Sequence, residues 1–314
     1  MSDLLRNIDA RTKLAGNNKL EILMFTLGFD SRSQRRETYG INVFKVREVM
    51  RVPEITQSPE MPNAVEGMVS LRGSLVPVID LAKYVGVQVE EKPTIMIVTE
   101  YNGHTQGFLV EAVDTILRLD WSSMRVPPDM LNSQTGGLVT AVTELADKRL
   151  VMMMDVEKVL SETGHFGDDE LIAKSVQPIN LPNRTVFFAD DSSVARKQIE
   201  KTLDAMNVQY ISAVNGSRAW AELKKIADSA EASQIPVHDM IQVILTDVEM
   251  PEMDGYMLTR KIKEDRRFKG IPVVMHSSLS SDSNQQLGKA VGVDEYVPKF
   301  EPQKLAQALT RLLT

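Results

Sequence analysis

The chain has 314 residues, of which 43% are hydrophobic and 25% charged, a composition typical of about two globular domains. Its formal net charge of −7 argues against the basic surface that unspecific binding of nucleic acid or anionic membranes requires. It contains no cysteine, which excludes disulfides, thiolate metal sites and thiol nucleophiles.

The N-terminal segment, residues 1–19, shows no apolar stretch of the kind found in secretory signals. A short amphipathic helix is expected at 4–14. The longest apolar runs of the chain, such as 150–154, are far too short to cross a bilayer. We therefore expect a cytoplasmic protein without direct membrane insertion.

Residues 20–162 are predicted to form an all-β domain. Short runs rich in β-branched and large apolar residues alternate with Gly, Pro, Asn and Asp, which is typical of a barrel or sandwich. Asn102 and Gly103 predict a hairpin turn, and a helical turn is expected at 155–161. The predicted strands are 20–28, 38–46, 66–71, 74–81, 94–101, 105–113 and 149–156.

Residues 163–183 hold glycines, prolines and an acidic run, which predict a linker. From 184 to 314, five strand-like runs alternate with helical periodicity, which indicates a parallel sheet with helices on both faces. The predicted strands are 185–190, 208–214, 240–247, 272–278 and 294–299. The predicted helices are 193–206, 217–230, 256–265, 283–291 and 302–313.

Charged residues follow several of these strands. Asp190 and Asp191 end the first strand, Asp247 the third, and Lys299 the fifth. Because chemistry gathers at the carboxyl ends of parallel strands, we expect three carboxylates and one ammonium at one sheet edge. Clustered carboxylates favour a hard divalent cation such as Mg²⁺, and an aspartate can accept a phosphoryl group.

Four motifs in this order resemble bacterial response-regulator receiver domains, which implies a flavodoxin-like fold. The motifs are FFADDS, ILTDVEMPEMDG, IPVVMHSS and YVPK. The resemblance implies that Asp247 is the phosphoacceptor and that Asp191 binds Mg²⁺ directly. It also implies that Asp190 binds the ion through water and that the main-chain carbonyl of Glu249 is a further ligand.

The same resemblance assigns Ser277 and Tyr296 as the switch hydroxyl and switch aromatic, and Lys299 as the lysine that pairs with the phosphoryl group. The sequence departs from the family at this lysine. Pro298 precedes it and Phe300 follows it, whereas the family usually has Lys-Pro with a cis bond. A cis bond before Phe would cost about 2.5–4 kcal/mol, so we expect a trans bond.

The first half offers no catalytic triad and no glycine-rich phosphate loop, which favours a binding function. Its motifs resemble the CheW-type chemotaxis coupling domain, and Arg72 matches a family arginine linked to partner contacts. The motifs are TYGINVFKVREVM, NAVEGMVSLRGSLVPVIDL and TQGFLVEAVDTILRL. The resemblance implies two five-stranded SH3-like barrels that bind a histidine autokinase and the cytoplasmic tips of chemoreceptors.

A coupling domain followed by a receiver is the arrangement of CheV-type chemotaxis proteins. It implies an adaptor at membrane receptor arrays, where phosphorylation of Asp247 modulates coupling or drains phosphate. Two alternatives stay open at this point. A receiver-regulated enzyme such as a methylesterase would need a catalytic set upstream, and a transcriptional regulator would need a DNA-binding domain.

Overall fold

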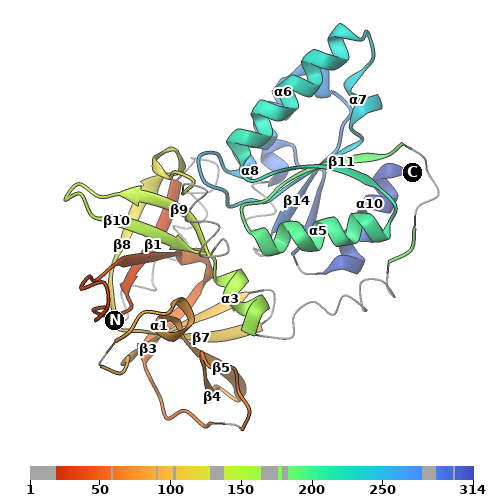
Figure 1. Ribbon diagram of the computed structural model, residues 1–314. Coiled ribbons are helices and arrows are strands. Elements are labelled where there is room, and N and C mark those ends of the chain that lie inside the picture. Colours follow the sequence, from red (N-terminus) through yellow and green to blue (C-terminus); the bar gives the residue numbers. More distant parts are fainter. Residues whose placement is uncertain are drawn as a thin grey trace. The chain divides into compact units, whose positions relative to one another are not determined.

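The computed structural model describes residues 19–57, 59–89, 91–101, 104–127, 138–163, 176–178, 183–277, 288–299 and 301–314. Of these residues, 20–163 fall into one compact unit and 176–314 into a second (Figure 1). The helix expected at 4–14 and most of the expected linker lie outside the described residues. The domain boundaries drawn from the sequence therefore stay predictions.

The first unit contains two five-stranded β-sheets. One sheet has the order β8-β1-β2-β10-β9, in which β1 pairs antiparallel with β2 and β10 pairs parallel with β2. Its strands are β1 (Lys19–Thr26), β2 (Thr38–Asn42), β8 (Ala112–Asp120), β9 (Val139–Glu144) and β10 (Leu150–Met154). Its apolar core consists of Leu20, Ile22, Trp121, Met124, Ala141 and Met153.

The second sheet has the order β3-β6-β7-β5-β4, in which β5 and β7 are parallel and the other neighbouring strands are antiparallel. Its strands are β3 (Val46–Arg51), β4 (Val65–Leu71), β5 (Ser74–Asp80), β6 (Ile95–Tyr101) and β7 (His104–Val110). Alternate residues of these strands bury Val69, Val76, Val78, Met96, Val98 and Leu109 in one cluster. The all-β prediction for this half is confirmed.

Several details of the first unit differ from the predicted elements. The run 38–46 is interrupted by a 3₁₀ turn, η2 (Val43–Lys45), because the side chain of Asn42 accepts a hydrogen bond from the Phe44 N–H. Strand β9, most of β8 and all of β3 except Val46 were not predicted, because their alternation of apolar and polar residues is short or incomplete. Short helical segments α1 (Leu81–Val85), η3 (Trp121–Ser123) and α3 (Val156–Thr163) complete the unit.

The predicted turn residues Asn102 and Gly103 lie outside the described residues. The strands on either side, β6 and β7, pair antiparallel with Tyr101 opposite His104.

The second unit contains a five-stranded sheet of order β12-β11-β13-β14-β15, in which all neighbouring strands are parallel. Its strands are β11 (Thr185–Ala189), β12 (Gln209–Ala213), β13 (Val243–Thr246), β14 (Val273–Ser277) and β15 (Glu295–Pro298). The predicted parallel α/β fold is confirmed.

Helices cover both faces of this sheet, as strand β11 shows. Val186 and Phe188 of β11 belong to the cluster beneath α5 (Ser193–Ala205) and α10 (Pro302–Leu313). Phe187 and Ala189 belong to the opposite cluster, beneath α6 (Gly216–Ala232) and α8 (Gly255–Glu264) (Figure 1). A strand buried on both faces reads as a continuous apolar run, as TVFFA does.

Side-chain caps fix where these helices begin. Ser192, Asn215 and Asp254 each accept a hydrogen bond from the first turn of α5, α6 and α8, respectively. The short segments α7 (Val237–Met240) and η4 (Arg266–Phe268) were not predicted. Of the helix expected at 283–291, only residues 288–291 are described, and they are helical.

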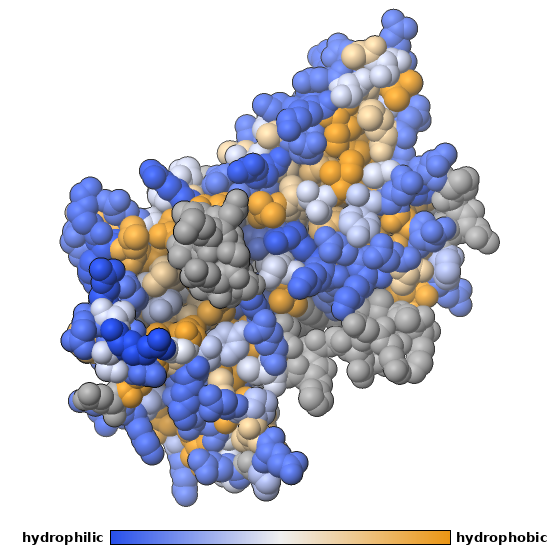
Figure 2. All heavy atoms as spheres, viewed as in Figure 1, coloured by the Kyte–Doolittle hydropathy of each residue, from blue (hydrophilic) through white to orange (hydrophobic). Residues whose placement is uncertain are grey.

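Hydrophilic side chains dominate the face of the molecule drawn in Figure 2. Among the described residues, the strongly exposed large apolar side chains are Phe29, Leu75, Leu150, Val214 and Ile235. None of the helices in the described ranges is long and apolar enough to cross a membrane.

Candidate functional site

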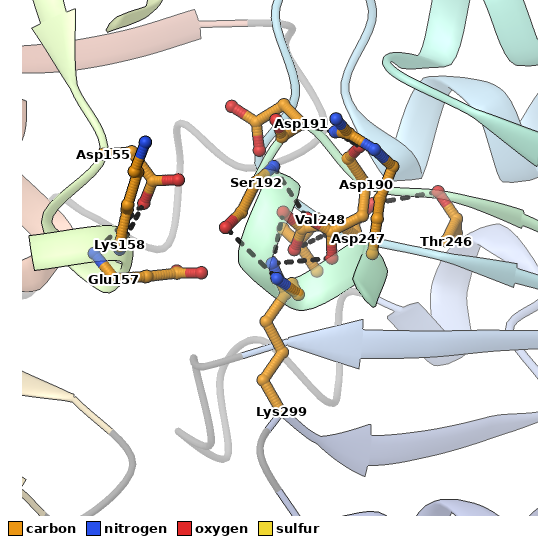
Figure 3. A network of polar contacts seen from close by, with 12 residues as sticks. Asp155, Glu157, Lys158, Asp190, Asp191, Ser192, Thr246, Asp247, Val248 and Lys299 are labelled. Atoms are coloured by element: carbon orange, nitrogen blue, oxygen red, sulfur yellow. Dashed lines mark hydrogen bonds and ion pairs between the residues drawn. The ribbon is translucent and has the colours of Figure 1, made fainter. Parts of the chain in front are cut away.

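The carboxyl edge of the second unit's sheet brings three aspartates together. Asp190 and Asp191 follow β11, and Asp247 follows β13, the neighbouring strand. The Asp247 N–H donates to the carbonyl of Ala189 at 2.8 Å, so the parallel pairing continues to the site. One ligand oxygen from each aspartate lies within 4.8 Å of the others (Figure 3).

Lys299, directly after β15, reaches into this cluster. Its Nζ lies 2.8 Å from Oδ2 of Asp190 and 2.9 Å from Oδ2 of Asp247 (Figure 3). The lysine side chain is only 1% exposed, and the backbone N–H of Lys299 donates to the Ser277 carbonyl. The lysine therefore reaches both carboxylates although no proline follows it. Phe300 lies outside the described residues, so the expected trans bond stays a prediction.

Backbone donors orient two of the carboxylates. The Val248 N–H donates to Oδ1 of Asp247 at 2.6 Å, and the Ser192 N–H donates to Oδ1 of Asp190 at 2.9 Å. Each of these carboxylates thus has one oxygen on a backbone N–H and the other on Lys299. Such contacts fix the directions in which the remaining lone pairs point.

The backbone of the phosphoacceptor candidate is packed tightly from the side of α8. A Cβ placed on Gly255 would lie 2.0 Å from the carbonyl oxygen of Asp247. The Gly255 N–H also donates to the carbonyl of Val248 at 2.9 Å. Only glycine permits this approach, which explains why Asp254-Gly255 stands at the start of α8.

The donor set fits Mg²⁺. All three donors are carboxylate oxygens, the ligand type that this hard cation takes. Three carboxylates against one ammonium leave an excess of negative charge, which a divalent cation would offset. Asp190 and Asp247 are buried, whereas Asp191 is half-buried, so a cation could reach the site from solvent on the side of Asp191. Glu249, also half-buried, lies on the loop after Asp247, and its ligand role stays a prediction.

The two switch candidates lie on neighbouring strands. Ser277 is the buried last residue of β14 and is paired with Pro298 of β15. Tyr296 of β15 is half-buried, and its hydroxyl lies 2.9 Å from the hydroxyl of Tyr256 at the start of α8. Burial raises the pKa of Tyr296 to about 12. Their switching roles stay predictions.

Sequence reasoning did not single out Tyr256 as a functional residue. It joins Val248 and Met275 in a buried cluster against which Tyr296 packs. The sequence could indicate a role for Tyr256 only through its position directly after Asp254-Gly255. The contact of its hydroxyl with Tyr296 depends on the direction of the side chain, which the sequence does not show.

In the first unit, Arg72 lies at the tip of the β4–β5 hairpin. Arg72 and Gly73 have φ values of +50° and +85°, as in the two-residue turn that favours glycine or asparagine. The Arg72 guanidinium pairs with Glu48 of β3 at 2.9 Å, and its side chain is 69% exposed. Glu48 was not predicted as a partner of Arg72, and the role of Arg72 in partner contacts stays a prediction.

Comparisons with known proteins agree with this two-part organisation. Residues 22–164 match the model of the CheW-like domain, and residues 186–310 match that of the response regulator receiver domain.

Similar proteins share both parts. "Chemotaxis protein CheV3" of Helicobacter pylori is 30% identical over 283 residues, which cover 88% of each chain. "Chemotaxis protein CheV1" of the same organism is 28% identical over 334 aligned positions, covering 100% of this chain and 99% of the relative. "Chemotaxis protein CheV2" is 28% identical and covers 99% of this chain and 100% of the relative.

Three findings lead to the same family. The first unit is CheW-like, the second has a parallel sheet with an acidic edge, and the similarity to the CheV proteins extends along nearly the whole chain. The chain belongs to the CheV family of chemotaxis coupling proteins, signalling adaptors in which a CheW-like domain is followed by a receiver domain.

Proposed function

We propose that this protein couples chemoreceptors to a histidine autokinase, and that phosphorylation of Asp247 modulates the coupling. The observation that carries the proposal is the cluster of three aspartates and Lys299 on the same chain as a CheW-like domain. Draining phosphate from the pathway is a second outcome of the same chemistry.

The reaction needs little beyond positioning and charge neutralisation. An oxygen of Asp247 attacks the phosphorus of the phosphodonor and forms the new P–O bond. The bond from phosphorus to the donor's leaving group breaks, and the leaving group keeps the electron pair. The Val248 N–H, 2.6 Å from Oδ1, holds the attacking carboxylate in place.

Asp190, Asp191 and Asp247 would hold Mg²⁺, together with the main-chain carbonyl of Glu249. When bound, the ion neutralises negative charge on the carboxylates and on the phosphoryl oxygens. The closeness of the three carboxylates supports this assignment, because without a cation they repel one another.

Lys299 already lies 2.9 Å from Asp247 and would transfer one of its hydrogen bonds to a phosphoryl oxygen. The Ser277 hydroxyl would donate a hydrogen bond to the phosphoryl group. Tyr296 would change its position when the end of β14, where Ser277 lies, moves. The placement of both at the carboxyl ends of β14 and β15 supports these roles.

The CheW-like unit, which we assign to residues 20–162, would bind the kinase and the receptor tips. Residues 163–183 would link it to the receiver at 184–314. This assignment places the protein in the cytoplasm at receptor arrays. The exposed guanidinium of Arg72 supports a role in partner contacts, because exposed charges govern specificity and association rate.

The test combines phosphorylation with binding. A small-molecule phosphodonor and Mg²⁺ should phosphorylate the wild-type chain, and chelation of Mg²⁺ or Asp247→Asn should abolish the reaction. Asp191→Ala should retain the acceptor but weaken Mg²⁺ binding. Undiminished phosphorylation of Asp247→Asn would remove Asp247 as the acceptor.

Binding is then measured with both forms of the protein. Titration of a receptor–kinase complex should give affinities that differ by about 5- to 150-fold between the phosphorylated and unphosphorylated chains. Equal affinities would leave the receiver as a phosphate sink.

A further inference from the structure

Arg196 of α5 contacts the backbone on which the metal-ligand candidates stand. A single guanidinium nitrogen, Nη1, donates to the carbonyl of Asp190 at 2.8 Å and to that of Asp191 at 2.9 Å. The backbone N–H of Arg196 donates to the Ser192 carbonyl at 3.0 Å. The arginine is therefore fixed by the first turn of the helix that directly follows the two aspartates.

These two hydrogen bonds act on main-chain carbonyls and not on the carboxylates. On the carboxylate side, Asp190 is held by the Ser192 N–H and by Lys299. On the carbonyl side, Arg196 fixes the two peptide planes that follow Asp190 and Asp191. The two fixed peptide planes flank Asp191, so they set the direction of its Cα–Cβ bond and the position from which its carboxylate extends.

Asp191 gains most from this support. Both peptide planes that flank Asp191 are held by Arg196, whereas only the plane after Asp190 is held in this way. Holding the backbone of Asp191 before a cation binds reduces the conformational entropy that binding would have to remove.

Arginine suits the task for two reasons. The guanidinium presents its planar donors in a rigid arrangement, which suits two neighbouring carbonyl acceptors. It also places positive charge beside an acidic loop without taking a carboxylate lone pair that a cation needs. Partners that orient metal ligands in this way commonly change metal affinity by about 10- to 100-fold when removed.

We propose that Arg196 is a positioning residue for the divalent cation of the receiver, acting through the backbone of Asp190 and Asp191. The inference rests on the proposed magnesium site but not on phosphorylation. It adds to the cluster a residue that touches neither the cation nor the phosphoryl group.

The test is a calorimetric titration of the full-length protein with Mg²⁺ alone, without phosphodonor. Arg196→Ala should weaken Mg²⁺ binding by about 10- to 100-fold, and Arg196→Lys should retain part of the affinity. Lys197→Ala, an exposed neighbour on the same helix, is the matched control and should leave the affinity unchanged.

Thermal unfolding in a chelator separates positioning from general support of the fold. A lower melting temperature of Arg196→Ala with wild-type Mg²⁺ affinity would overturn the inference and leave Asp247 phosphorylation intact. If Arg196→Ala fails to fold, Arg196→Lys replaces it in the test. Wild-type Mg²⁺ affinity of Arg196→Lys would show that the guanidinium is not needed and would overturn the inference. A wild-type chain that binds no Mg²⁺ would remove both the site and the inference.

Discussion

Lys299 and Arg72 are both cations at hydrogen-bond distance from a carboxylate, yet their surroundings differ. Nζ of Lys299 lies 2.8 Å from Oδ2 of Asp190, and the lysine side chain is 1% exposed. Nη2 of Arg72 lies 2.9 Å from Oε2 of Glu48, and the arginine side chain is 69% exposed. Water screens the second pair but hardly reaches the first. Equal distances therefore carry unequal energies, and the two sites should respond differently to substitution.

The largest contrast is expected from Lys299→Met, which removes the charge and keeps the length of the side chain. Two buried carboxylates would then face each other, and the loss of one partner from a buried ion pair costs about 3–5 kcal/mol. We expect the free energy of unfolding of the receiver, measured in the presence of a chelator, to fall by this amount. Added Mg²⁺ should restore much of the lost stability.

Lys225→Met is the control in the same unit. Lys225 pairs with Glu222 at 2.9 Å, but its side chain is 72% exposed. The change should cost at most about 1 kcal/mol, with no response to Mg²⁺. Equal losses in the two variants would refute the contrast between buried and exposed pairs.

The next effect is a pH dependence from Asp254, the cap of α8. Burial raises its pKa to about 6. The folded state then keeps its proton to a higher pH than the unfolded state, so stability is full below about pH 4 and falls as the pH rises through 6. Asp254→Asn, which stays uncharged, should be more stable than wild type at pH 7.5 by up to about 3 kcal/mol.

Asp265→Asn provides a control of opposite sign. Its hydrogen bond from Arg267 lowers the pKa of this half-buried carboxyl. Its contribution is present at neutral pH and is lost as the pH falls through that lowered pKa, so the variant should be less stable at pH 7.5. Chemical unfolding at pH 4.5 and 7.5 measures both differences. A pH-independent gain from Asp254→Asn would contradict the assignment.

A smaller effect is expected where two phenols meet. The hydroxyls of Tyr256 and Tyr296 lie 2.9 Å apart, and a hydrogen bond of this kind contributes about 0.5–1.5 kcal/mol. Tyr256→Phe, Tyr296→Phe and the double variant form a cycle. The double variant should be little less stable than either single variant. If the two losses simply add, the hydroxyls do not interact.

The smallest change in stability is expected at Arg72. Asn favours the left-handed turn position that Arg72 occupies, so Arg72→Asn removes the guanidinium while keeping the turn. Stability should change by less than about 0.5 kcal/mol, whereas the affinity for a receptor–kinase complex should fall. Unchanged affinity would leave Arg72 as a turn residue with an ion pair to Glu48.

The difference between these sites also explains what the sequence could predict. Asp190, Asp247 and Lys299 follow strands of a parallel sheet, and topology alone brings strand ends together. Arg196, Tyr256 and Glu48 meet their partners through side-chain directions, which no spacing encodes. The parallel pairing of β10 with β2 was missed for a related reason, because pairing between strands far apart in the sequence leaves no local pattern.

That parallel pairing has a consequence for how the protein is made. Strand β2 (Thr38–Asn42) stays without one of its neighbours until β10 (Leu150–Met154) has been synthesised. At about 5–20 residues per second, the nascent chain would expose an open strand edge for on the order of ten seconds. In the receiver, strand β11 gains its second neighbour, β13 (Val243–Thr246), after a much shorter stretch of chain. The CheW-like unit should therefore depend more on chaperones during translation than the receiver.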